Sequence, residues 1–259
     1  MNFDLLMLLI FAIALALLMY VKRQKVKVEK ILFPVVYMIL YRTKLGLKLM
    51  DKLGRKHERF VRIFGVVGIV LGFVGMIFIL VVLSFGIWKF LFANGPAPVG
   101  LLLPGVKTAP GLPVLSFWHW IIAIFILAGV HEFNHGLLSR AWRVKVKSSG
   151  FAVFSIFLPL IPAAFVEPDE EELVKSGKKA QLSVFAAGSY ANFITAALSL
   201  VLFLFILTPV TSGMIESHGV MVIGTVDNYP ANISEIKAGE EILKVNDDEI
   251  KDLTGFFES

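Results

Sequence analysis

The chain has 259 residues, of which 57% are hydrophobic and 17% are charged. This composition excludes an ordinary soluble domain and indicates a membrane protein. The absence of cysteine excludes a disulfide framework and thiolate catalysis. The net charge of +5 comes from one basic segment, which anionic lipid head groups attract, so no nucleic-acid partner is needed to explain it.

Four stretches are apolar over the ~20 residues that a helix needs to cross a hydrocarbon core. They predict membrane-spanning helices at residues 3–20, 63–92, 114–139 and 182–209. The first stretch is not a cleavable signal peptide, because it begins with Asp4 and no Lys or Arg, and no small-residue cleavage site precedes the basic run after it. We expect a retained anchor and a multi-pass protein of a prokaryotic cell membrane.

The distribution of basic residues predicts which side of the membrane each loop faces. Residues 22–62 contain 13 Lys or Arg and three acidic residues, whereas residues 93–113 contain only Lys107. The positive-inside rule then places residues 22–62 in the cytoplasm and the N-terminus and residues 93–113 outside. The third span runs inward and the fourth outward, so the tail after residue 209 is expected on the outer face.

Residues 151–166, "FAVFSIFLPLIPAAFV", are apolar but too few for a membrane-spanning helix, and they contain Pro159 and Pro162. The alternating run "RVKVKSSG" precedes them, which favours a strand pair or a re-entrant loop packed against protein or water. An interfacial helix or a short buried helix is the alternative. If the segment is strand-like, residues 145–157 could hold an extended peptide by edge pairing.

The third predicted span carries three ionisable side chains. His131 and His135 are four residues apart and therefore project from one face of a helix, with Glu132 beside them. Two imidazoles so placed can bind one Zn²⁺, and a neighbouring carboxylate can take a proton from water, as in H-E-x-x-H zinc metalloproteases. A satisfied core histidine is the usual alternative, but a group of three ionisable residues inside a membrane favours function.

Four segments in order, "GVHEFNHGLLSRAW", "VKSSGFAVF", "PAAFVEPDEEEL" and "FAAGSYANFITAAL", resemble the site-2 protease family of intramembrane zinc metalloproteases. The resemblance covers residues 114–207. It implies that His131 and His135 bind zinc and that Glu132 is the general base.

The family's G-x-x-x-N element matches Gly188 to Asn192. The resemblance implies that Asn192 positions the substrate or stabilises the oxyanion. The alternative is that Asn192 only hydrogen-bonds across a helix interface, where the small residues around Gly188 permit close packing.

The tail from residue 219 onward alternates β-branched residues and then continues with "AGEEILKVNDDEI". It resembles the first part of a PDZ domain, a type of domain that can bind a peptide as an added strand. The later strands and helix of such a domain are not present in the sequence, so the expected domain is partial.

The sequence thus predicts an α-helical polytopic membrane protein with about four transmembrane helices, a re-entrant β-like segment and a truncated PDZ-like α+β domain. Residues 1–62 are expected to form an N-terminal membrane anchor and a basic cytoplasmic segment. Residues 63–208 are expected to form a membrane-embedded metalloprotease core, and residues 209–259 the partial PDZ-like extracytoplasmic domain.

The predicted function is cleavage of transmembrane segments of other membrane proteins by a zinc metalloendopeptidase, in regulated intramembrane proteolysis. The expected partners are transmembrane protein substrates and the lipid bilayer. A non-catalytic membrane scaffold or an inactive fragment is the alternative. A metal transporter is a further alternative, although no internal repeat of the kind common in transporters is found.

Two histidines leave a zinc site one protein ligand short. The resemblance implies that the third ligand is an aspartate in a D-G motif on a later helix, and no such motif occurs in these residues. Glu167 is the in-chain candidate, because it closes the apolar segment. We therefore expect the 259 residues to be part of a longer enzyme.

Overall fold

A computed structural model describes residues 3–32, 35–100, 102–107, 114–156, 158–214, 219–226, 229–246, 248–251 and 253–258. The chain divides into two compact units, Met1–Ala196 and Ala197–Ser259. The first unit contains a four-stranded sheet and most of the long helices, whereas the second contains short strands and helices.

Among the described residues, four helices are long and apolar enough to cross a membrane. This agrees with the four predicted spans, and the protein is an integral membrane protein. Most of their side chains are not buried: in α3 only Val61, Gly65 and Gly68 are buried. Apolar surface of this extent suits lipid and not water. The helices are α1 (Phe3–Val21), α3 (Glu58–Phe92), α4 (Phe117–Ala141) and α6 (Lys178–Leu202), and α6 continues through the π-helical turn η2 (Phe203–Leu207) into α7 (Thr208–Met214).

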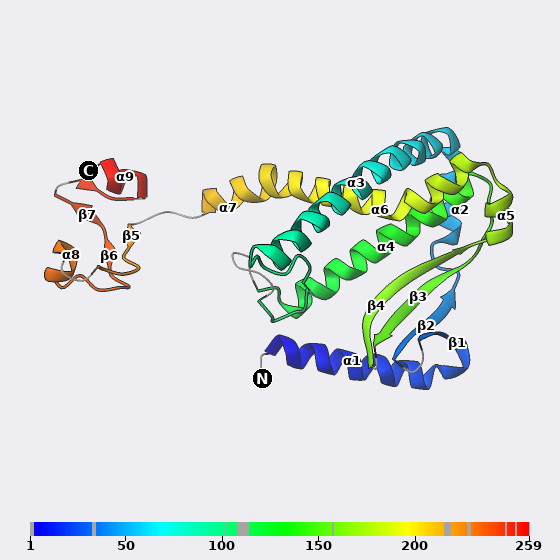
Figure 1. Cartoon of the computed structure of the whole chain (residues 1–259), viewed down its shortest axis with the longest axis horizontal. Helices are drawn as coiled ribbons and strands as arrows, with labels where there is room; N and C mark the ends of the chain where they lie inside the picture. The colour runs from blue at the N-terminus through cyan, green and yellow to red at the C-terminus, as the bar shows by residue number, and fades with distance from the viewer. Residues whose placement is uncertain are drawn as a thin grey trace. The chain divides into compact units, whose positions relative to one another are not determined.

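A four-stranded antiparallel sheet lies between α1 and α4 (Figure 1). Its strand order is β1-β2-β3-β4. β3 and β4 confirm the predicted strand pair over an apolar segment, in place of the alternative helix; that this pair re-enters the membrane stays a prediction. The strands are β1 (Val26–Leu32), β2 (Val36–Thr43), β3 (Val146–Ile156) and β4 (Leu158–Pro168).

The expectation that residues 145–157 offer a free strand edge was wrong. β3 pairs with β2 on one side and with β4 on the other, so its backbone groups are already used. β1 and β2 come from the basic segment at residues 22–62, for which the sequence pattern predicts no secondary structure. The sheet edges are therefore β1 and β4.

Gly150 allows β2, β3 and β4 to approach closely. A Cβ at this position would overlap the backbone oxygen of Tyr41 on β2 and would lie 2.9 Å from the ring of Phe165 on β4. Only glycine leaves room for both neighbours. The same register pairs Arg42 with Gly150, which places the Arg42 side chain within reach of Glu167 on β4.

The turn from α4 into β3 ends the helix in a defined way. The N–H of Val144 donates to the carbonyl of Ser139 (2.8 Å), and Arg143 adopts a left-handed φ of 64°. This is the hydrogen-bond pattern of a Schellman cap, which satisfies a free carbonyl at a helix end. The chain then leaves α4 directly into the sheet that packs on it.

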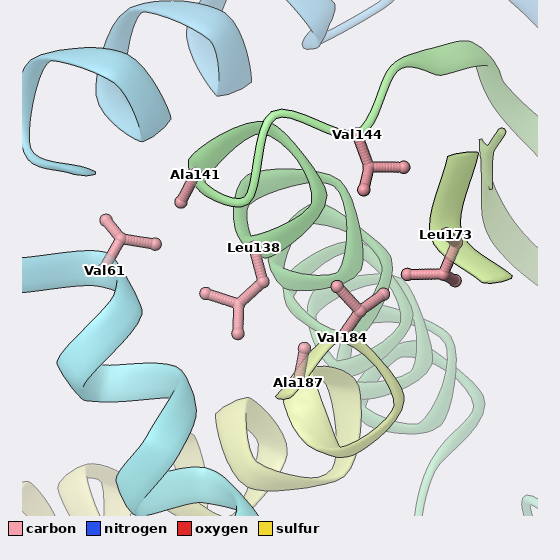
Figure 2. Close-up of a cluster of buried hydrophobic side chains, with 7 residues drawn as sticks. All are labelled: Val61, Leu138, Ala141, Val144, Leu173, Val184 and Ala187. Atoms are coloured by element: carbon pink, nitrogen blue, oxygen red, sulfur yellow. The ribbon is translucent and has the colours of Figure 1, made fainter. Parts of the chain in front are cut away.

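A core of buried apolar side chains joins α3, α4, α6 and the short helix α5 (Glu170–Lys175) at one end of the first unit (Figure 2). Glycines on α3 permit this packing, because a Cβ on Gly65 or Gly68 would collide with side chains of α4 and α6. The remaining helix of this region is α2 (Leu47–Lys56). The core residues are Val61, Leu138, Ala141, Val144, Leu173, Val184 and Ala187.

The N-terminal ends of α1 and α4 lie next to each other. The backbone N–H of Phe117, the first residue of α4, donates to Asp4 Oδ1 on the first turn of α1 (2.8 Å). Leu8 packs with Phe117 and Trp120 in a second apolar cluster. α1 and α4 therefore start on the same side of the molecule.

The second unit contains two short antiparallel pairs, β5 with β6 and β7 with β8. These pairs do not test the PDZ-like resemblance, which stays a prediction, as does the predicted division into three domains. The elements are β5 (Val220–Met221), α8 (Pro230–Ile233), β6 (Glu241–Ile242), β7 (Lys244–Val245), β8 (Asp248–Glu249) and α9 (Leu253–Glu258).

Candidate metal centre

His131, Glu132 and His135 lie together on α4, as the helical spacing predicts. A ligand atom from each residue lies within 4.8 Å of the others, and all three side chains are partly buried. The two imidazole rings are 4.9 Å apart between centroids and meet edge to face. Among the described residues this is the group of His and carboxylate side chains that could hold a metal ion.

Helix α6 orients both imidazoles. His135 Nδ1 lies 2.6 Å from the carbonyl oxygen of Val184, and His131 Nδ1 lies 3.2 Å from the side-chain amide of Asn192. Each Nδ1 therefore has a partner on α6, which leaves the Nε2 atoms for a metal. Metal-binding histidines are commonly held in this way by a hydrogen bond to the other ring nitrogen.

Gly188 lies on α6 between these two contacts and faces the histidines. A Cβ at this position would overlap His131 Nε2 and would also collide with His135 Nε2. A residue without a side chain is therefore required for α6 to approach the pair. The predicted G-x-x-x-N element thus brings two features to one site: room at Gly188 and a polar group at Asn192.

The hydrogen bonding of Asn192 tests whether the site fits a metal. Its Nδ2 faces His131 Nδ1, while its Oδ1 is buried without a hydrogen-bond partner. A histidine that binds a metal through Nε2 carries its proton on Nδ1. Rotating the amide by 180° would let Oδ1 accept that proton and would turn Nδ2 toward the position that now lacks a partner. The donor set and its surroundings therefore fit a zinc ion.

Glu132 is held from the sheet. The backbone N–H of Val166 on β4 donates to Glu132 Oε2 (2.9 Å). Val166 approaches α4 closely at this point, because a Cβ on Gly136 would lie 3.2 Å from its side chain. No sequence motif indicates this contact, since the donor is a backbone group.

A cleft of about 480 Å³ opens at the site. Glu132 and His135 line it together with Arg42 and Glu167. Arg42 comes from the N-terminal part of the chain and binds Glu167 through Nε (3.2 Å). The cleft gives a carboxylate and a histidine of a membrane-spanning helix a route to polar surroundings, which buried ionisable groups need.

Glu167, the in-chain candidate for the third metal ligand, does not join the two histidines. Glu167 lies outside the metal-competent group. Its carboxylate accepts hydrogen bonds from Ser148 Oγ (2.6 Å) and from Arg42. The hydrogen bond from Ser148, followed by that from Arg42, holds the pKa of Glu167 below the ordinary value of 4.5. The Glu167 carboxylate therefore joins β4 to β2 and β3 within the sheet.

Comparison with known proteins supports the resemblance found in the sequence. An uncharacterized protein of Methanocaldococcus jannaschii, MJ0971, is 30% identical to this chain over 254 residues, which cover 96% of the chain and 62% of the relative. The chain thus spans less than two thirds of the length of that relative. No solved structure matches it. The sequence pattern of Peptidase family M50 matches residues 119–255, more than half of the chain. The chain therefore belongs to Peptidase family M50, the site-2 protease family of zinc metalloproteases.

Proposed function

We propose that the protein is an intramembrane zinc metalloendopeptidase that cleaves transmembrane segments of other membrane proteins. The observation that carries this proposal is the group of His131, Glu132 and His135 on an apolar helix, of which Glu132 and His135 line a cleft that also contains charged side chains. Ionisable side chains at such a position are costly unless they are paired or hydrated, so their presence favours catalysis over packing.

His131 and His135 would hold the metal through their Nε2 atoms, while Val184 and Asn192 fix the rings from α6. Zn²⁺ bound there would supply Lewis-acid chemistry, polarising a peptide carbonyl and making water more acidic. Glu132 would accept the proton of the attacking water and return it to the leaving amine. This use of one carboxylate as base and then acid needs an oxygen that is free to accept a proton.

Asn192 has two roles in this proposal. Its Oδ1 accepts from His131 Nδ1 when the histidine binds metal, which makes Asn192 a positioning residue. Its Nδ2 group then points away from the ring and can donate to the oxygen of the scissile carbonyl as negative charge develops there. Both roles depend on the approach of α6 that Gly188 allows.

A substrate helix must unwind before cleavage, because its carbonyls are hydrogen-bonded within the helix. An extended segment can recover these bonds by pairing with a strand edge. β4 offers such an edge next to Glu132, since β3 occupies only its other side. We propose β4 as the strand that receives the substrate.

Replacing Glu132 with Gln tests the proposal. The variant keeps the size of the side chain but removes the base, so zinc should stay bound while cleavage of a membrane protein substrate falls by several orders of magnitude. Glu171→Gln, on the exposed first turn of α5, is the matched control and should cleave normally. A non-catalytic scaffold would behave the same with either substitution, and full activity of Glu132→Gln would reject the proposed role.

A further inference from the structure

The outer edge of β4 presents few hydrogen-bond donors. The N–H of Val166 points to Glu132 on α4, and backbone groups alternate between the two sides of a strand. The backbone groups of residues 162, 164, 166 and 168 therefore point to the outer edge. Two of these are proline, Pro162 and Pro168, which have no N–H. Over residues 162–168 the edge therefore offers two donors, Ala164 and Val166, which lie between the two prolines.

One of these two donors is occupied by the proposed catalytic base. Glu132 Oε2 lies 2.9 Å from the Val166 nitrogen, the position at which a carbonyl of an added strand would bind. Glu132 thus satisfies an edge N–H that would otherwise lack a partner beside an apolar helix. A peptide strand on β4 and the Glu132 carboxylate therefore compete for the same donor, the Val166 N–H.

We propose that this hydrogen bond is a substrate-operated latch on Glu132. A peptide strand that pairs with β4 supplies its own carbonyl to the Val166 N–H and takes the place of Glu132 Oε2. The released carboxylate no longer accepts a hydrogen bond from Val166 and becomes a stronger acceptor for the proton of the attacking water. Binding of an extended segment and release of Glu132 Oε2 from Val166 are therefore one event, which couples the unwinding of the substrate to the activation of the base. This inference rests on the proposed pairing of substrate with β4.

The latch makes an unusual prediction for binding. Because substrate must displace Glu132, removing the carboxylate should tighten binding, although it abolishes catalysis. Glu132→Gln keeps an oxygen that accepts from Val166, whereas Glu132→Ala does not. Both variants are inactive, so both can be studied with zinc bound and without turnover.

The experiment measures the binding of a fluorescein-labelled transmembrane peptide, built of alternating leucine and alanine with a central Asn-Gly, to purified protein in detergent micelles. Glu132→Ala should bind this peptide about two- to tenfold more tightly than Glu132→Gln, the effect of one net hydrogen bond. In the Val166→Pro background, where the shared donor is gone, the two variants should bind equally. Such a coupling shows that the effect passes through the Val166 N–H.

Ala164→Pro removes the other edge donor without touching Glu132 and separates the latch from the proposed function. This substitution in the Glu132→Gln background should weaken binding severalfold. If Ala164→Pro has no effect, pairing on β4 is wrong, and the latch fails with it. If Ala164→Pro weakens binding but Glu132→Ala and Glu132→Gln bind equally, pairing holds and the latch alone is overturned. That comparison uses the native Val166 and decides the question even if Val166→Pro does not fold.

Discussion

At the scale of single residues, the site depends on a missing side chain as much as on those present. The two histidines are brought together by α4 alone, but their orientation depends on contacts with Val184 and Asn192 on α6. These contacts need α6 to lie against the imidazoles, which Gly188 permits. Even a methyl side chain at position 188 would therefore disturb the site without removing any polar group.

Gly188→Ala should lower zinc affinity by about 10- to 100-fold, the range seen when groups that orient metal ligands are lost. The added methyl group would collide with both Nε2 atoms, which are the proposed ligand atoms. Titration of the purified protein with zinc in competition with a chelator measures the change.

Gly129→Ala is the matched control for this substitution. It lies on α4 two residues before His131, and a Cβ there meets nothing within 4 Å. Zinc affinity should remain as in the native protein, and the helix should gain slightly in stability. Equal zinc affinity of Gly188→Ala and Gly129→Ala would contradict the role given to Gly188.

His131 and His135 should each be needed for metal binding. Replacing both with Ala removes the two nitrogen ligands, so the protein should lose the bound equivalent of zinc. Elemental analysis of protein purified in mild detergent gives the stoichiometry. Zinc retained in full by the double variant would place the metal elsewhere.

The residues of the site differ in how far the sequence could predict them. His131, Glu132 and His135 follow from helical spacing, because one helix brings them together without any tertiary contact. Asn192 and Gly188 came from the family resemblance, since their nearness to α4 depends on helix packing. Val184 and Val166 act through backbone groups, for which the side-chain sequence carries no signal.

At the scale of elements, the sheet explains why the N-terminal segment matters to the site. β2 brings Arg42 to the cleft, where it binds Glu167 of β4 (3.2 Å). The β3–β4 pair could be predicted from the length of the apolar segment and its prolines. The charges of residues 22–62 predict on which side of the membrane this segment lies, but not that it forms strands. The sequence did not predict β2 because its pairing with β3 joins residues more than a hundred positions apart, and local patterns do not specify such partners. β1 pairs only with β2 and depends on it for its place in the sheet.

Acid should weaken the sheet through Glu167. The Ser148 hydroxyl and the Arg42 guanidinium lower the pKa of this carboxyl in the folded state. A lowered folded pKa gives stability that is fully present above the ordinary pKa of 4.5 and lost as pH falls through the folded value. The thermal midpoint of the native protein, measured by tryptophan fluorescence, should therefore decrease when the pH is lowered below about 4.5.

Glu167→Gln should reduce this loss, because the variant has no carboxyl group to protonate at that position. A remaining part should persist, since the Asp169 and Glu172 carboxyls, which accept backbone hydrogen bonds, also have lowered pKa values. Glu171→Gln serves as the exposed control. Parallel curves for the native protein and Glu167→Gln between pH 6 and pH 3 would show that the Arg42–Glu167 contact does not stabilise the fold.

At the scale of the whole molecule, contacts within the first unit restrict the membrane topology independently of charge. β2 pairs with β3, so the segments that follow α1 and α4 must lie on one side. The Asp4–Phe117 contact places the starts of these two helices together at their other ends. The basic residues decide only which side is the cytoplasm.

Single cysteines test both parts of this topology, since the native chain has none. Lys44→Cys after β2 and Lys179→Cys at the start of α6 are exposed positions on the side of the sheet, and Ala97→Cys is an exposed position in the loop after α3. In spheroplasts, a membrane-impermeant maleimide should label Ala97→Cys at once and the other two only after permeabilisation, because the 13 basic residues in the segment 22–62 predict a cytoplasmic location for it. Inverted labelling of all three would reverse the orientation and leave the fold intact. Labelling of Lys44→Cys and Lys179→Cys from opposite sides would be incompatible with the sheet. It would also contradict the placement of Arg42 and Glu167 in the cleft beside Glu132.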